Sequence, residues 1–160
     1  LDIFKAAMGK EGNIYEIRDL IDEVFTIPEA RALFIEQLIK ELPNLNLAPF
    51  EQEFLKLDAK ELSRFIFEGH CDRLPKLRLD PSPNFLFTRD LAAFAGSTVV
   101  ISRAAKKARI RESLAMECLV KYHPLFEEVR DKSIFVKGNN SIEGGDVLIV
   151  SEEVVLIGMS

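Results

Sequence analysis

The sequence has few cysteines and no long apolar run. These two features argue against a cysteine metal site and against a membrane-spanning protein. Cys71 and Cys118 are the only cysteines in 160 residues. Their number fits a reducing compartment, and they lack the spacing of metal ligands. No apolar run approaches the ~20 residues of a membrane-spanning helix, and no secretory leader is visible. We therefore expect a cytoplasmic protein with free thiols, no metal site and no membrane partner.

Basic residues are outnumbered, which bears on the class of partner. The chain has 21 Lys and Arg against 26 Asp and Glu, a net charge of −5, and an isoelectric point near 5.2. Binding to nucleic acid phosphates needs a basic surface, so this balance argues against nucleic acid as a partner. The apolar content of 48% is ordinary for a globular protein. A length of 160 residues fits one domain, or one small domain with an insertion.

The stretch 83–90 combines apolar and charged residues in a way that suggests a site. Its aromatic, large apolar and β-branched residues predict a short buried strand over 85–88, which ends at Arg89 and Asp90. An unpaired buried charge is costly, so a buried strand that ends in charges usually presents them to a site. A carboxylate such as Asp90 suits a planar guanidinium with paired N–H donors. The alternative is a local pair with Arg89 or a helix cap.

The residues before this stretch predict mainly short helices. Alternation predicts a strand over 13–17, after the end of a helix at 1–8. Apolar spacing then predicts a helix over 18–25 and one from Thr26 as N-cap to Pro43. Asp58 and Glu61 repeat the cap pattern before a further helix, which Gly69 closes. These helices carry no charge constellation beyond a solvated face. We interpret them as scaffold or lid.

The residues after this stretch predict a mixed α/β unit. β-Branched runs and helical spacing predict a strand over 97–102, a helix over 107–122, and strands over 134–136, 147–150 and 154–157.

Two further segments hold charged candidates for a site. In Glu143-Gly144-Gly145-Asp146, the glycines permit a tight turn with positive φ and a close approach of ligand to backbone, although a surface turn is the alternative. Arg109 lies in a basic run near a predicted helix start, where the macrodipole disfavours cations and an anion would relieve the conflict. It is therefore a candidate to bind a carboxylate. The alternative for the run is a solvated face paired with acidic neighbours.

The thiols and imidazoles suggest no nucleophile with a base beside it. Cys118 lies on the apolar stripe of its helix and is expected to be an inert core thiol. Cys71 follows His70, but adjacent residues rarely make a side-chain hydrogen bond of useful geometry. His123 precedes Pro124 and is expected to end a helix.

Several segments together resemble the arginine deiminases. Residues 84–90 resemble the PNxxFTRD motif of that family, and residues 108–113 resemble its A-R-x-x-E-T/S segment. Residues 142–147 resemble its EGGD motif, and residues 155–160 are similar to the strand that follows. The resemblance implies an α/β fold of the pentein type, a propeller of ββαβ units, here incomplete and with an inserted helical subdomain. The implied domains are the start of the catalytic domain at 1–17, the helical insertion at 18–75, and further catalytic units at 76–160.

The resemblance also implies a reaction and the roles of several residues. L-Arginine and water would give L-citrulline and ammonia through a cysteine thiouronium intermediate. Asp90 would hold two guanidinium nitrogens, and Glu143 would orient the catalytic histidine and stabilise the cationic intermediate. Arg109 and Asn84 would bind the substrate α-carboxylate, and Phe87 would pack on the aliphatic stem. Asp146 would support the substrate-binding residues, and the resemblance implies no cofactor.

The chain departs from the family pattern after Asp90, where 91–97 lack the usual small residue and glycine-rich turn. The family's catalytic cysteine and histidine have no counterpart here, and Leu1 replaces an initiator methionine. We therefore expect part of a longer polypeptide that is inactive alone and has the remainder of that polypeptide as partner. Homo-oligomer formation stays open. The alternatives are an amidinotransferase, a dimethylarginine hydrolase, or a non-catalytic binding module on the same scaffold.

Overall fold

The computed structural model describes residues 13–138, 140–151 and 153–158. The helix predicted at 1–8 lies outside these residues. The first half of the described chain is helical. Its elements are α2 (Ile17–Val24), α3 (Pro28–Glu41), η1 (Pro43–Leu45), η2 (Ala48–Phe50), α4 (Glu51–Leu55) and α5 (Ala59–Glu68), where η marks a 3₁₀ helix. Among the described residues, no helix is long and apolar enough to cross a bilayer.

The second half alternates short helices with strands. Its elements are η3 (Pro83–Leu86), α6 (Thr88–Leu91), β1 (Ala92–Ala95), β2 (Thr98–Ile101), η4 (Lys107–Arg109), α7 (Ile110–Tyr122), η5 (Pro124–Phe126), α8 (Glu127–Arg130), β3 (Ser133–Phe135), η6 (Gly144–Asp146), β4 (Val147–Ile149) and β5 (Val155–Ile157). The prediction of a mixed α/β chain is confirmed.

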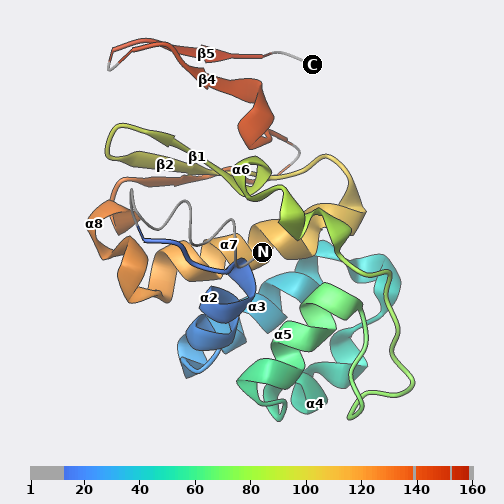
Figure 1. Cartoon of the computed structure of the whole chain (residues 1–160). Helices are drawn as coiled ribbons and strands as arrows, with labels where there is room; N and C mark the ends of the chain where they lie inside the picture. Colours follow the sequence, from blue (N-terminus) through green and yellow to red (C-terminus); the bar gives the residue numbers. More distant parts are fainter. Residues whose placement is uncertain (1–12, 139, 152, 159–160) are drawn as a thin grey trace.

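The strands form two small sheets. In the first, β1 pairs antiparallel with β2, and β2 pairs parallel with β3. The parallel pair requires a crossover, which α7 supplies. In the second sheet, β4 and β5 form an antiparallel hairpin. Figure 1 shows the layers: the hairpin on one side of the three-stranded sheet, α7 on the other side, and helices α2 to α5 beyond α7.

Helix α7 joins the two halves because it has apolar residues on most of its surface. It packs on both α2 and α3. Ala115 and Leu119 are fully buried, and the Cys118 thiol lies 3.5 Å from the Ala30 carbonyl oxygen. The core is continuous from the helical cluster through α7 to β2. Because α7 is packed on both sides, its N-terminal end, where Arg109 lies, is held in place.

Local sequence signals set two helix boundaries as predicted and one differently. The Asp58 side chain accepts a hydrogen bond from the Glu61 backbone, the Glu61 side chain returns one, and Gly69 closes α5 with φ of 77°. The prediction of Thr26 as the N-cap of α3 is wrong. Its hydroxyl donates to the Glu23 carbonyl at 2.7 Å, and Ile27 is the N-cap. Thr26 therefore closes α2 instead of opening α3.

Two predicted strands are wrong. Residues 85–88 fall in η3 and α6, with Phe87 between them, because Pro83 opens a helical turn. Leu86 and Phe87 are 82% and 55% exposed. Only Phe85 is buried, with its ring centroid 4.4 Å from that of Phe67. Residues 13–16 have no regular structure, and Ile17 already begins α2.

Candidate functional site

Three predicted site residues converge from distant parts of the chain. Asp90 lies in α6, Arg109 ends η4, and Glu143 precedes η6. The Arg109 guanidinium contacts both carboxylates: Nη1 lies 2.7 Å from Glu143 Oε2, and Nη2 lies 3.5 Å from Asp90 Oδ2. We call these residues, together with Glu112, the carboxylate cluster. The arrangement holds one guanidinium between acidic side chains.

Arg109 is well buried and strongly paired. Its side chain is 11% exposed, while those of Asp90 and Glu143 are 30% and 35% exposed. Burial by itself lowers the pKa of Arg109, but the hydrogen bonds and charges of Glu112 and Glu143 outweigh burial and raise that pKa above its ordinary value. Arg109 therefore stays charged. The anions that offset its unfavourable place near a helix start are carboxylates of the same chain.

Glu112 is a fourth member of the cluster, although the sequence pattern indicates it only as one of the acidic neighbours on a solvated face. Its side chain is 1% exposed, and Arg109 Nε donates to its Oε2 at 3.0 Å. The sequence signal was the i, i+3 spacing, which places both residues on one helical face. Burial raises the pKa of Glu112, and the hydrogen bond from Arg109 opposes the shift without cancelling it. Glu112 therefore anchors Arg109 from the buried side.

Replacing Glu112 with glutamine is expected to change how stability depends on pH. Because the folded-state pKa lies above the ordinary value of 4.5, the folded chain binds more protons than the unfolded chain just above pH 4.5. The free energy of unfolding therefore falls as pH rises through this window, and Glu112→Gln removes that fall. Urea unfolding of both chains from pH 4.5 to about pH 7 measures it. A difference between the two chains that stays constant with pH contradicts the raised pKa.

The turn from Glu143 to Asp146 is held by its own hydrogen bonds. The Glu143 N–H donates to Asp146 Oδ2 at 2.9 Å, and the Asp146 N–H donates to the Glu143 carbonyl at 2.9 Å. The prediction of positive φ at its glycines is wrong, because neither Gly144 nor Gly145 is among the residues with positive φ. A Cβ on Gly144 would lie 1.8 Å from the Arg89 carbonyl oxygen. Gly144 therefore allows close approach of the chain's own α6.

The other predicted site residues lie near the cluster without joining it. Asn84 is half-buried in η3, and its backbone lies close enough to lower the pKa of Glu112. Phe87 is exposed before α6. Arg89 is exposed, and among the described residues it has no ion pair. The exposed Phe87 ring leaves an apolar surface open beside the cluster.

The cysteines and histidines of the chain lie outside the cluster. Cys71 and Cys118 are 3% and 1% exposed, and burial raises the pKa of both thiols, so neither is a ready thiolate. The prediction of Cys118 as an inert core thiol is confirmed. His123 ends α7, and its Nε2 lies 3.0 Å from Glu23 Oε2. His70 Nδ1 lies 3.2 Å from the Glu68 carbonyl oxygen.

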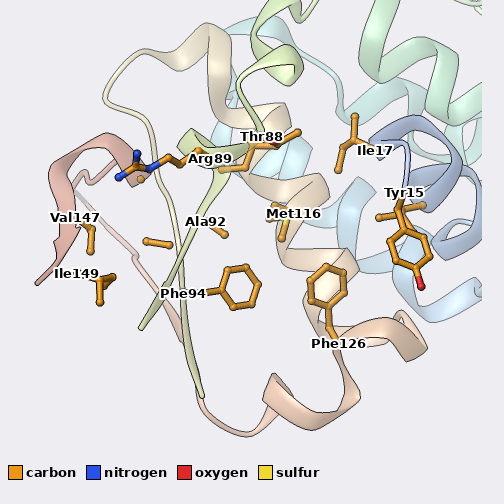
Figure 2. Close-up of a pocket in the computed structure, with 14 residues that line it drawn as sticks. Tyr15, Ile17, Thr88, Arg89, Ala92, Phe94, Met116, Phe126, Val147 and Ile149 are labelled. Carbon is orange, nitrogen blue, oxygen red and sulfur yellow. The ribbon is translucent and has the colours of Figure 1, made fainter. Parts of the chain in front are cut away.

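An apolar cavity of about 460 Å³ lies next to the cluster. Figure 2 shows Phe94 of β1 and Phe126 of η5 facing each other across it, with Met116 of α7 between them. Arg89 is its charged lining residue, and Asp90, Arg109 and Glu143 do not line it. The cavity therefore offers apolar surface and not the acidic groups of the cluster.

Comparisons with known proteins identify the family of the chain. The family model for arginine deiminase matches residues 68–160, which include every member of the cluster. The chain is 34% identical over 181 aligned residues to arginine deiminase 1 of Staphylococcus epidermidis and to arginine deiminase of Staphylococcus haemolyticus. It is 32% identical over 181 residues to arginine deiminase of Bacillus cereus.

Each alignment covers 99% of this chain and 44% of the relative. The chain thus spans about half the length of the curated relatives it matches. The family match covers more than half of the chain, and it includes the segments of all three motifs. The chain belongs to the arginine deiminase family.

Proposed function

We propose that this chain forms the guanidinium-binding part of an arginine deiminase, which converts L-arginine and water to L-citrulline and ammonia. One observation carries the proposal: the acidic residues of two family motifs, Asp90 and Glu143, already surround a guanidinium group, that of Arg109. A site that accepts this group from its own chain has the charge and spacing to accept it from a substrate.

Asp90 is the residue that grips the substrate in this proposal. A carboxylate accepts two N–H bonds from the planar guanidinium fork, which fixes the plane of the group and exposes its carbon to attack. The Arg109 Nη2 contact to Asp90 is the longest in the cluster, at 3.5 Å. Asp90 is therefore the carboxylate that a substrate guanidinium displaces from Arg109 most easily.

Arg109 then changes partner and stays in the site. The hydrogen bond from its Nε to buried Glu112 stays in place, while its Nη atoms leave Asp90 and Glu143. The freed Nη groups are donors for the substrate α-carboxylate, and Asn84 provides a second polar group beside them. The exposed Phe87 ring packs on the aliphatic stem of the substrate.

Glu143 acts on the charge that develops during the reaction. With Arg109 displaced, its carboxylate stabilises the cationic intermediate and orients a histidine that activates water. Asp146 holds the Glu143 backbone through the 2.9 Å hydrogen bond and so fixes where this carboxylate lies. Because Glu143 is 35% exposed, a histidine from another segment has access to it.

The nucleophile comes from outside these 160 residues. In the proposed reaction, a thiolate attacks the guanidinium carbon, and one NH2 group takes up a proton and leaves as ammonia. Water then attacks the same carbon, which releases citrulline and restores the thiol. Both thiols of this chain are buried with raised pKa, so the chain alone does not turn over. Free thiols also suit a reducing compartment, and we assign the protein to the cytoplasm.

The remainder of the polypeptide completes the pentein propeller in this proposal. Residues 1–17 and 76–160 belong to its catalytic domain, and residues 18–75 are a helical insertion. Support comes from the β4–β5 hairpin, where Leu148 and Leu156 are 54% and 55% exposed. Further ββαβ units would cover these apolar side chains.

L-Arginine is expected to displace the Arg109 side chain in the isolated chain, whereas L-citrulline is not. Citrulline is a matched control because it keeps the amino acid part and replaces the charged guanidinium by a neutral ureido group. Nitrogen-15 NMR at constant ionic strength would follow the Nη groups of Arg109 and the amides of Asp90 and Glu143. A saturable change with arginine alone supports the proposal, and equal changes with both compounds contradict it.

A further inference from the structure

A second cavity, of about 480 Å³, lies between the end of α3, the loop after α5 and the start of α7. Leu42, Leu45 and Leu79 give it apolar walls. Its volume falls within the ~300–1,000 Å³ typical of small-molecule sites. No residue of the carboxylate cluster lines it. We call it the basic cavity, for the charges described next.

Cations outnumber anions on the wall of this cavity. Arg78, Lys107 and Arg111 line it, with Asp80 as the acidic residue. This balance is opposite to that of the whole chain, whose net charge is −5. Because the walls are partly apolar, the field of these cations is screened less than on an open surface. The cavity therefore favours an anion over a neutral or cationic molecule.

Arg111 contributes a buried charge whose direct hydrogen-bond partners are backbone carbonyls. It is 3% exposed, and its guanidinium donates to the backbone carbonyls of Phe65, Ile66 and Asp80. Two of these carbonyls belong to the last turn of α5, where the helix dipole favours a cation. Among the described residues Arg111 has no ion pair. Burial lowers the pKa of Arg111, although the charges of Glu112 and Asp80 oppose that shift. This buried cation therefore gains from a further anion nearby.

The basic cavity also touches the segment that carries Arg109. Lys107 and Ala108 line the cavity and are two of the three residues of η4, and Arg109 is the third. We propose that the basic cavity binds a compact organic anion, with a carboxylate or phosphate near the cations and an apolar body against the leucines. A bound anion would hold η4 in place, and with it the segment that carries Arg109. This site does not depend on the guanidino chemistry, because its ligand has the opposite charge.

Phenyl phosphate is a suitable probe, because it joins an anionic group to an apolar ring. In calorimetric titrations of the 160-residue chain, we expect saturable binding of phenyl phosphate, tighter than that of inorganic phosphate. Lys107→Glu and Arg78→Glu should each weaken binding by about tenfold or more, because a like charge then faces the ligand. Amide shifts in 107–111 should accompany binding.

Lys106→Glu is the matched control. It makes the same change of charge one residue away, at an exposed position that does not line the cavity. Unfolding curves for all variants test whether each chain remains folded. Binding that is weakened by Lys107→Glu but not by Lys106→Glu supports the site. Equal weakening by both, or no saturable binding, overturns it.

Discussion

Gly144→Ala is expected to destabilise the chain by about 3 kcal/mol or more, in the upper range for overpacking. A Cβ at this position would lie 1.8 Å from the Arg89 carbonyl oxygen and 2.9 Å from its carbon. Both are backbone atoms, so relief requires α6 and η6 to separate. That movement also separates Asp90 from Glu143, since these two residues flank the contact. Gly144 thus connects the stability of the fold to the geometry of the site.

Gly145→Ala is the matched control for this prediction. Its Cβ would lie 3.8 Å from Asp90 Oδ1, an ordinary van der Waals contact, and its φ is not positive. We expect a change below about 1 kcal/mol, the usual scale of a surface substitution. Urea unfolding of both variants at neutral pH gives the comparison. Similar midpoints for Gly144→Ala and the unaltered chain contradict the proposed close contact.

Asp90→Asn is expected to reduce citrulline formation by about 10³-fold, as loss of a single electrostatic contact to a reacting group often does. The substitution keeps the shape of the side chain but removes its charge and one of its two acceptor oxygens. The assay uses a chimaera in which residues 1–160 replace the matching segment of Staphylococcus epidermidis arginine deiminase 1. The rate constant kcat/KM for L-arginine reports the loss.

Asp131→Asn makes the same chemical change at an exposed residue at the end of α8. It should leave kcat/KM within about twofold, because surface substitutions of this kind have small effects. Glu143→Gln should also lower kcat/KM, as Asp90→Asn does, since both carboxylates face the guanidinium. If the Asp90→Asn chimaera is as active as the Asp131→Asn chimaera, Asp90 does not bind the substrate guanidinium.

Local signals in the sequence predicted those elements whose boundaries depend on neighbouring residues. Asp58, Glu61 and Gly69 act within one helix, and their roles are those predicted. The strand predicted over 85–88 is wrong because its composition suits a strand, but among the described residues no strand pairs with it. The proline-initiated turn at Pro83 then determines the backbone. Propensity is a weak guide where pairing partners come from elsewhere.

The candidate site could be predicted as a set of residues but not as a set of contacts. Family motifs pointed to Asp90, Arg109 and Glu143, whose positions in sequence are far apart. That Arg109 binds the two carboxylates depends on how η4, α6 and η6 meet, which no local pattern encodes. Gly144 shows the same limit, because the sequence predicted a close approach of a ligand there, whereas the neighbouring atom is the Arg89 carbonyl oxygen of the same chain.

The most direct measurement is citrulline formation from L-arginine by the chimaera that carries the unaltered 160 residues. We predict turnover within about a hundredfold of the parent enzyme, because a misplacement of about 1 Å at the junctions can cost that much. The isolated chain, tested beside it, should form no citrulline. A chimaera that folds as stably as the parent and forms no citrulline contradicts the claim that this chain supplies the guanidinium-binding residues.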